Sequence, residues 1–284
     1  MKEKVLITGS NGFIGKQLKK QFNLTEYEIV EFNSSDGDIA KTDLQFENIN
    51  HVFHLAGKSF VPDSWKNPKA FYDVNFTGTL NVLELCRKTG AGLTFISSYV
   101  YGIPQHQPIN ENHPINPANP YGHSKLVAEE ICQFYSENFK LHTTIIRPFN
   151  IYGTFQSDHF LIPTIIKQLF DEKQLAIDIL DLMPKRDYLF LDDLISAIMI
   201  LYKKNKTGIY NVGSGTSLSV EEIIKDIMEI AGIQKKYVSK EVSRKNEIPE
   251  VIADISKIKK ETGWVPGFTF KQGIAEILKR EQLR

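Results

Sequence analysis

The segment KVLITGSNGFIG (residues 4–15) decides the fold of this chain. Its first half is a short β-branched run that ends in glycine, a pattern typical of a buried strand. The glycines that follow let the backbone turn tightly, approach a ligand closely and pack a helix on the strand. A helix N-terminus after such a turn offers free N–H groups and a positive dipole end to a pyrophosphate. The segment therefore predicts a dinucleotide site, with contacts from Gly9, Asn11, Gly12, Phe13, Ile14 and Gly15.

Strands and helices alternate over the first half of the chain. This alternation is typical of a parallel sheet that is covered by helices on both faces. We therefore expect an α/β fold with a Rossmann-type, doubly wound parallel sheet. The predicted strands are 27–32, 51–57, 93–98 and 142–150, and the predicted helices are 77–90 and 120–138.

The second half is less regular and predicts a smaller, discontinuous C-terminal substrate lobe. Helices are expected at 160–170, at 219–232 and up to residue 280, and a strand leads into a helix at 186–204. Ser219 and Glu222 form a capping-box pattern, and Gly232 ends the helix that they begin. We assign residues 1–150, with about 186–214, to an NAD(P)-binding Rossmann domain, and residues 151–185 and 215–284 to a substrate-binding lobe.

Composition argues against several kinds of partner. The 284 residues are 42% hydrophobic, and 34 basic side chains balance 34 acidic ones, so no net field favours nucleic acid or an anionic membrane. Cys86 and Cys132 lie in half-apolar helical patterns and are expected to pack rather than pair. The chain enters a strand almost at once and has no apolar run of membrane-spanning length, so we expect a cytoplasmic protein without a signal peptide. His51 and His54 would lie on opposite faces of a strand, so no metal site is predicted.

The end of the second strand bears on the choice between NAD and NADP. An acidic residue at this position pairs with the 2′-hydroxyl of the adenosine ribose in NAD. Here Asn33 and Ser34 occupy it, and neither side chain repels a phosphate. NADP or NAD therefore remains open, with NADPH slightly preferred. Asp38 and Ile39 follow in the region expected to border the adenine ring.

Residues NPYGHSK (119–125) place Tyr121 and Lys125 four apart. On a helix two such side chains share one face, and a cation beside a phenol lowers the tyrosine pKa towards neutrality. A tyrosine of this kind can exchange a proton at neutral pH. Taken alone, the stretch fits a surface helix better, so its interpretation depends on the rest of the chain.

The motifs, taken in order, resemble the extended short-chain dehydrogenase/reductases that act on nucleotide sugars, the NAD-dependent epimerase/dehydratase family. The resemblance covers nearly the whole chain, and the joint order of the motifs is highly specific. They are TGSNGFIG (8–15), HLAG (54–57), NFTGT (75–79), FISSYVYG (95–102), YGHSK (121–125), RPFNIYG (147–153), RDYLFLDD (186–193), NVGSG (211–215), Arg244 with EIP (247–249), and GWVP (263–266).

The resemblance implies a catalytic triad. Tyr121 matches the tyrosine that exchanges a proton with the sugar oxygen, and Lys125 matches the lysine that holds the nicotinamide ribose and lowers the tyrosine pKa. The third member lies four residues before a Tyr-Gly pair, which points to Ser97, with the adjacent Ser98 as the alternative. Further cofactor contacts are implied for Leu55, Ala56, Gly57 and Asn75.

The resemblance also implies a site for a nucleotide-diphosphate sugar. Asn150 matches a residue that hydrogen-bonds the diphosphate, and Arg186 and Arg244 match arginines that grip the same group. Glu247 matches an acid on the nucleotide ribose, and Ser97 would contact the sugar. Members of the family pair two helices across a two-fold axis, so we expect a homodimer through helices 77–89 and 121–138.

Three functions remain open. Tyr99 stands where 4,6-dehydratases carry an acid and where epimerising reductases carry a cysteine, which argues against both reactions. We favour NAD(P)H-dependent reduction of the 4-keto group of a nucleotide-activated 4-keto-6-deoxy sugar, in nucleotide-sugar biosynthesis for a surface polysaccharide. The alternative is an NAD-dependent C4-epimerase of a UDP-sugar. A non-catalytic NADP-binding regulator ranks last, because the chain keeps both Tyr121 and Lys125.

Overall fold

The computed structural model describes residues 2–242 and 248–283. The chain divides into two compact units, each of which is assembled from separate segments. The first comprises Met1–Ile103, Pro114–Pro148 and Ile195–Asn211. The second comprises Pro104–His113, Phe149–Leu194 and Val212–Arg284.

A six-stranded parallel sheet forms the centre of the first unit. Its strand order is β10-β5-β4-β3-β1-β2. The order reverses beside β1, because β2 lies on one side of β1 and β3 on the other. The strands are β1 (Glu3–Thr8), β2 (Tyr27–Phe32), β3 (His51–His54), β4 (Gly92–Ile96), β5 (Thr143–Pro148) and β10 (Gly208–Val212).

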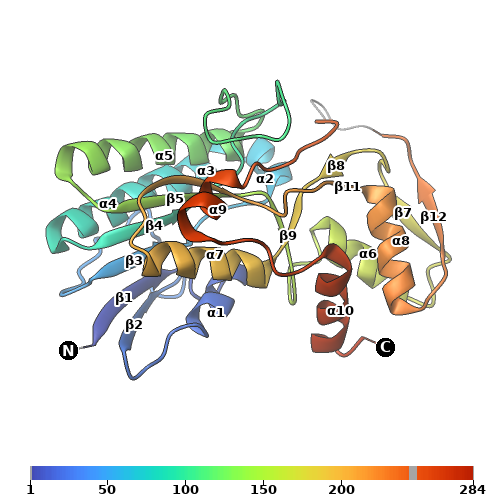
Figure 1. Ribbon diagram of the computed structural model, residues 1–284, viewed down its shortest axis with the longest axis horizontal. Coiled ribbons are helices and arrows are strands. Elements are labelled where there is room, and N and C mark those ends of the chain that lie inside the picture. Colours follow the sequence, from blue (N-terminus) through green and yellow to red (C-terminus); the bar gives the residue numbers. More distant parts are fainter. Residues whose placement is uncertain (1, 243–247, 284) are drawn as a thin grey trace. The chain divides into compact units, whose positions relative to one another are not determined.

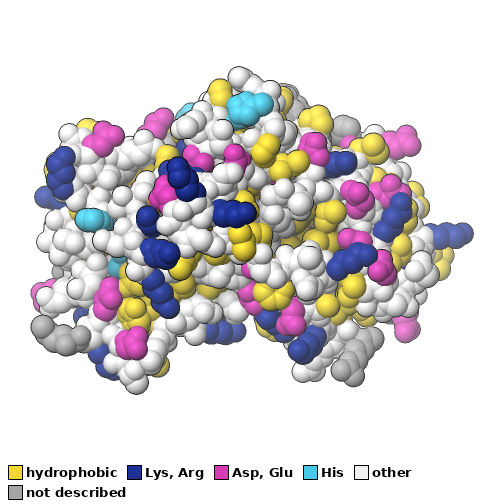
Figure 2. All heavy atoms as spheres, in the orientation of Figure 1, with side chains coloured by type: hydrophobic (Ala, Val, Ile, Leu, Met, Phe, Trp, Pro, Cys, Tyr) yellow, Lys and Arg dark blue, Asp and Glu magenta, His cyan; other side chains and the backbone are white. Residues whose placement is uncertain are grey.

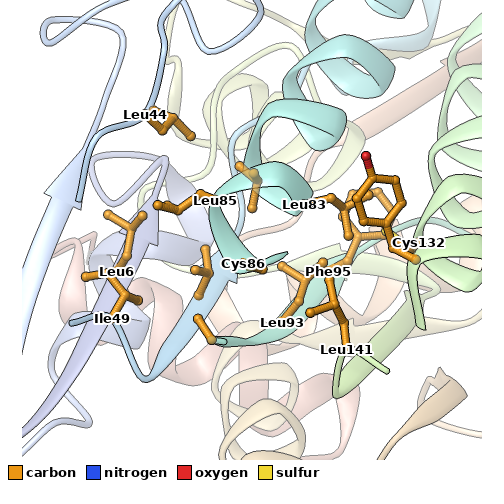
Figure 3. Close-up of a cluster of buried hydrophobic side chains, with 14 of the residues drawn as sticks. Leu6, Leu44, Ile49, Leu83, Leu85, Cys86, Leu93, Phe95, Cys132 and Leu141 are labelled. Carbon is orange, nitrogen blue, oxygen red and sulfur yellow. The ribbon is translucent and has the colours of Figure 1, made fainter. Parts of the chain in front are cut away.

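Helices cover both faces of this sheet, which confirms the predicted doubly wound architecture. One face carries α4 (Gly78–Thr89) and α5 (Pro120–Phe139), and the other carries α1 (Phe13–Lys19) and α7 (Leu191–Lys203) (Figure 1). The core between the sheet and the α4–α5 layer is built from branched aliphatic and aromatic side chains (Figure 3). Cys86 and Cys132 lie within it as buried free thiols, as their helical patterns predicted.

The connection from β3 to α4 is more structured than its sequence suggested. It contains α2 (Val61–Lys66), α3 (Pro68–Tyr72) and a π-helical turn, η1 (Asp73–Thr77). Asn67 caps α3 by accepting a hydrogen bond from the Ala70 N–H, and Pro68 suits the first helical position. These elements are too short to give a clear hydrophobic period, so sequence patterns alone begin the helix only at residue 77.

The second unit has its own core and three small two-stranded sheets. These pair β6 (Asn150–Tyr152) with β9 (Tyr188–Phe190), β8 (Lys185–Arg186) with β11 (Leu218–Ser219), and β7 (Ala176–Ile179) with β12 (Lys236–Ser239). The predicted capping box of Ser219 and Glu222 is present at the start of α8. The helices of this unit are α6 (Leu161–Phe170), α8 (Val220–Ala231), α9 (Ser256–Thr262) and α10 (Phe270–Arg280).

The observed division differs from the predicted one in two longer segments, and the boundary residues 149–150 and 212–214 also group with the second unit. Residues 186–194 and 104–113 group with the second unit, whereas the sequence assigned them to the Rossmann domain. Strand pairing explains both differences. β9 pairs with β6, and Ile109 forms an isolated bridge with Ala253. The functional assignment of the two units remains a prediction.

Charged side chains of both signs appear on each unit in the face that Figure 2 shows, in keeping with the balanced composition. Within residues 2–242 and 248–283, no helix combines the length and apolar character needed to cross a membrane.

Candidate active site

The glycine-rich turn lies where the strand order reverses, at the carboxyl ends of β1 and β3. Gly9 has a φ of +71°, and a Cβ there would lie 2.8 Å from the backbone nitrogen of Ala56, in the segment that follows β3. A Cβ at Gly15 would lie 2.3 Å from the carbonyl oxygen of Gly9. Only glycine therefore allows β1, this turn and α1 to approach so closely. Dinucleotides bind at such switch points in open α/β sheets.

Asn33, predicted to read the adenosine ribose, is engaged with the glycine-rich turn. Its side-chain oxygen accepts a hydrogen bond from the Asn11 N–H at 2.9 Å, and its side-chain nitrogen donates to the Ser10 hydroxyl at 2.8 Å. The Ser10 hydroxyl also bonds the carboxylate of Glu31, which Lys19 pairs at 2.8 Å. The structure thus places the carboxylate of Glu31, which the sequence analysis did not consider, near the end of β2 and beside the predicted ribose site.

Of the other predicted adenosine contacts, Ser34 is exposed, whereas Ile39 is buried in the core. Asp38 remains accessible and pairs with Lys41 at 3.4 Å. The Ile39 carbonyl accepts a hydrogen bond from the Asn81 side chain at 2.9 Å, which fastens this segment to α4.

The segment after β3 contains three predicted cofactor residues, of which Gly57 lies beside Lys125. Leu55 and Ala56 donate their N–H groups to Thr8, at 3.1 and 3.3 Å. The buried Asn75 accepts a hydrogen bond from the Lys58 N–H at 2.8 Å. A Cβ at Gly57 would lie 3.0 Å from the Asn75 side-chain oxygen and 3.2 Å from Lys125 Nζ. Glycine at this position therefore keeps space open beside the ammonium group.

Helix α5 positions Tyr121 and Lys125. Asn119 caps the helix by accepting a hydrogen bond from the Gly122 N–H at 2.8 Å, and Pro120 occupies its first turn. Lys125 is buried, donates to the Ile96 carbonyl at 2.8 Å, and lies 4.7 Å from the centre of the Phe95 ring. Burial lowers the pKa of Lys125 to about 8.

The pKa of Tyr121 departs from the sequence prediction. The neighbouring lysine led us to expect a lowered pKa, whereas burial raises it to about 12. A hydrogen bond with Ser98 acts in the lowering direction and offsets part of this effect. The expectation was wrong because the sequence shows a lysine one helical turn away but not the burial of the phenol. Tyr121 is therefore a neutral phenol at pH 7.

The structure brings Ser98, rather than Ser97, to Tyr121. The two serines follow β4, where side chains alternate in direction, so their hydroxyls take different partners. Ser98 bonds Tyr121, whereas the buried Ser97 donates to Glu129 on α5. The preference for Ser97 came from counting back from the Tyr101-Gly102 pair. The geometry favours the alternative, Ser98, as the hydroxyl beside the tyrosine.

A buried polar network lies next to these residues in the first unit. Arg147 on β5 forms a fork with Glu129, with Nε 3.0 Å from both carboxylate oxygens and Nη2 2.5 Å from one of them. Its Nη1 donates to the Tyr101 hydroxyl at 2.9 Å, and Tyr101 donates to Asn211 at 2.6 Å. Sequence reasoning missed Glu129, although Tyr121, Lys125 and Glu129 recur every four residues on one helix face.

In the second unit, Asn150 and Arg186 lie on β6 and β8. The Asn150 side chain donates to the Asp187 carbonyl at 3.2 Å, and Arg186 donates to the Ile248 carbonyl at 2.6 Å. Asp187 is fully buried, and its carboxylate accepts N–H groups from Ser214, Gly215 and Ala253. Asp187 thus fixes the backbone next to Arg186. Two further predicted substrate residues, Arg244 and Glu247, lie outside the described residues.

A glycine-rich turn at the switch point, with a serine, a tyrosine and a lysine on neighbouring elements, defines a Rossmann-fold oxidoreductase of the short-chain dehydrogenase/reductase class. The sequence profile of the family described as GDP-mannose 4,6 dehydratase matches residues 19–277. The chain belongs to this NAD(P)-dependent epimerase/dehydratase family of nucleotide-sugar enzymes.

Its relatives carry out more than one reaction. The GDP-6-deoxy-D-mannose reductase of Pseudomonas aeruginosa is 30% identical, over 98% of this chain and 97% of the relative. A putative UDP-glucose 4-epimerase of Methanocaldococcus jannaschii is 31% identical, over 96% of this chain and 97% of the relative. A solved structure of RMD from Pseudomonas aeruginosa complexed with NADPH has a TM-score of 0.88 and 30% identity, and covers 98% of each chain.

Proposed function

We propose that this protein reduces the 4-keto group of a nucleotide-activated 4-keto-6-deoxy sugar with NAD(P)H, in nucleotide-sugar biosynthesis for a surface polysaccharide. The observation that carries the proposal is the grouping at the start of α5, where Ser98 hydrogen-bonds the Tyr121 phenol and Lys125 follows one helical turn later. A neutral phenol suits a reaction that begins with proton donation to a ketone oxygen. The likeness to a reductase over nearly the whole chain supports the same function.

The reaction converts the C4 ketone to an alcohol, for which the reduced nicotinamide supplies the hydride. Tyr121 donates its hydroxyl proton to the ketone oxygen as the hydride reaches C4, so that no free alkoxide accumulates. Ser98 hydrogen-bonds the tyrosine oxygen and stabilises the charge that develops there. Lys125 would hold the nicotinamide ribose through its ammonium group, which donates to the Ile96 carbonyl.

The residues after Ser98 support reduction over dehydration. Tyr99 and Val100 follow it, and neither carries the carboxyl group that would remove water from the sugar. The C4-epimerase of a UDP-sugar remains the second candidate, supported by the relative in Methanocaldococcus. An epimerase begins by oxidising C4, for which Tyr121 must accept the sugar proton instead of donating one.

NADPH is the cofactor that we favour, with NAD as the alternative. The structural neighbour that is complexed with NADPH supports this choice. The glycine-rich turn, the segment Leu55–Gly57 and Asn75 would hold the cofactor.

One experiment separates the reductase from the epimerase: the purified protein is analysed for nucleotide released on denaturation. A reductase should release little NAD and consume added NADPH with a 4-keto sugar nucleotide, whereas an epimerase should release about one NAD per chain.

The second unit is proposed to bind the nucleotide diphosphate through Arg186, together with Asn150, Arg244 and Glu247. Arg186→Ala should weaken the binding of UDP, GDP or dTDP by about 1.5–3 kcal/mol, because a charge-assisted bidentate contact is lost. Its exposed neighbour on the same strand offers a matched control, and Lys185→Ala should change this affinity little. Calorimetry with each nucleotide and, separately, with NADPH measures both effects. Loss of NADPH affinity with unchanged nucleotide affinity would refute the assignment of this unit.

The homodimer is proposed to form through α4 and α5. Most apolar side chains of α4 are buried in the core, whereas α5 keeps Phe134 51% exposed, with Leu126, Val127 and Ile131 partly exposed. A partner helix would cover this surplus apolar surface. Light scattering at micromolar concentration should give the mass of two chains. Phe134→Arg should shift the mass towards one chain, whereas Leu24→Arg, at another exposed apolar position, should not. A monomeric wild-type protein would contradict the proposal.

A further inference from the structure

Glu129 is fixed from two sides inside the first unit. It is fully buried on α5, one turn beyond Lys125 and two turns beyond Tyr121. The Ser97 hydroxyl donates to its carboxylate from the end of β4, and the Arg147 fork donates to it from β5. Burial disfavours the charged guanidinium, but the hydrogen bonds and the charge of Glu129 more than offset this and raise the pKa of Arg147. Glu129 and Arg147 therefore form a charged pair without access to water.

Ser97 lies between Ile96 and Ser98, the two residues that hydrogen-bond Lys125 and Tyr121. On one side, the Ile96 carbonyl accepts a hydrogen bond from Lys125 at 2.8 Å; on the other, Ser98 bonds Tyr121. The Ser97 N–H donates to the Ile146 carbonyl at 2.8 Å and continues the pairing of β4 with β5. The side-chain bond to Glu129 is thus the tether that fixes this strand end against α5.

Glu129 also supplies charge to Lys125. The groups that influence Lys125 are Cys132 and Glu129 on its own helix and His54 on β3. Burial raises the pKa of Cys132 well above its usual range, so its thiol is neutral. Burial, with the charge of Lys125, lowers the pKa of His54 to about 3, and Thr8 and Thr79 bond its ring in neutral form. Arg147 on β5 offsets part of the field of Glu129, and Tyr121 is a neutral phenol. Among these described groups, Glu129 carries the negative charge.

We propose that Glu129 is a positioning residue of the reaction site: through Ser97 it fixes the strand end that orients Lys125 and Ser98. The same carboxylate lies one helical turn from Lys125 and favours its charged ammonium form. The proposal rests on the proposed function in taking Tyr121 and Lys125 as the reacting pair. It adds a role for a residue that is fully buried and lies outside the proposed substrate and cofactor contacts.

The tether is tested by removing one hydroxyl at a time from the same network. Ser97→Ala should lower kcat about tenfold with an unchanged KM, because small displacements of reacting groups cost orders of magnitude in rate. Tyr101→Phe removes a hydroxyl from the other side of Arg147 and should leave kcat within about twofold of wild type. Thermal unfolding of both variants shows whether stability alone explains the difference. Wild-type kcat in Ser97→Ala, or equal losses in the two variants, would overturn the tether.

The charge is tested by the pH dependence of NADPH affinity, a measurement that needs no turnover. A protonated Lys125 donates to the ribose, so affinity should fall as pH rises through the Lys125 pKa of about 8. Glu129→Gln keeps the shape and removes the charge, so Lys125 should lose its proton more readily and the midpoint should move down by about one pH unit. Glu129→Asp keeps the charge and should keep the midpoint near that of wild type.

Glu129→Gln leaves Arg147 buried without a counter-charge and could prevent folding. The double variant Glu129→Gln/Arg147→Met removes both charges, and its midpoint should also move down. An unchanged midpoint in a folded variant would refute the role of the charge. A wild-type protein that shows this pH dependence but reduces no 4-keto sugar nucleotide would overturn the proposed function and leave the role of Glu129 in place.

Discussion

Tyr121→Phe should lower turnover at least a hundredfold while leaving NADPH affinity near that of wild type. The substitution removes the one proton that the ketone oxygen receives and keeps the ring that packs against Phe71. General acid catalysis by a positioned side chain contributes about 10²–10⁴-fold in rate. Steady-state kinetics with a 4-keto sugar nucleotide, together with NADPH fluorescence titration, measures both quantities.

Tyr72→Phe is the matched control for this variant. Tyr72 lies nearby on α3, and its hydroxyl bonds the ring nitrogen of His123 at 3.0 Å. Replacing Tyr72 with phenylalanine therefore also deletes one phenol hydroxyl from this region. Turnover of the control should stay within a few-fold of wild type. If Tyr121→Phe kept turnover within threefold of wild type, Tyr121 could not be the proton donor.

Arg147→Met should lower the free energy of unfolding by about 3–5 kcal/mol. Removing one partner of a buried ion pair leaves the other charge without compensation, which costs far more than the pair itself contributes. Glu129 and Arg147 are 0% and 1% exposed at their side chains, so water cannot replace the lost partner. Urea unfolding, followed by circular dichroism and by tryptophan fluorescence, measures the change.

An exposed ion pair of the same chemistry gives the control. Arg87 bonds Glu84 on α4, and both side chains are more than a third exposed, at 39% and 35%. Arg87→Met should therefore cost less than about 1 kcal/mol. The double variant Glu129→Gln/Arg147→Met should recover part of the stability that Arg147→Met loses, because no unpaired charge remains. Equal costs for Arg147→Met and Arg87→Met would contradict the importance of the buried pair.

The parts of the fold that have strong local signals could be predicted from the sequence. Glycines in the first turn, β-branched runs and helical periods fixed the parallel sheet and the cofactor turn, and Ser219 with Glu222 fixed the start of α8. The short strands of the second unit gave no such signal. β8 and β11 are only two residues long and pair across more than thirty residues of chain, so contacts distant in sequence determine them.

At the site, the sequence identified the residue types but not their surroundings. Tyr121 and Lys125 were found from their spacing, whereas burial, which sets the pKa of both, depends on the packing of α5 against the sheet. The choice between Ser97 and Ser98 depended on where β4 ends and which face each side chain takes. The Glu129–Arg147 pair joins α5 to β5, and a helical spacing alone could not show which strand would supply its partner.

The transfer of a labelled hydride tests the central proposal most directly. The protein is incubated with NADPH that carries deuterium on the transferred position of its nicotinamide and with a nucleotide 4-keto-6-deoxy sugar, and the sugar product is analysed by mass spectrometry and NMR. A 4-ketoreductase should place one deuterium on C4 of each product molecule and consume one NADPH for it. The reductase would be contradicted if no labelled product formed. If the protein, with its retained NAD, instead interconverted a UDP-sugar and its C4 epimer, it would be an epimerase.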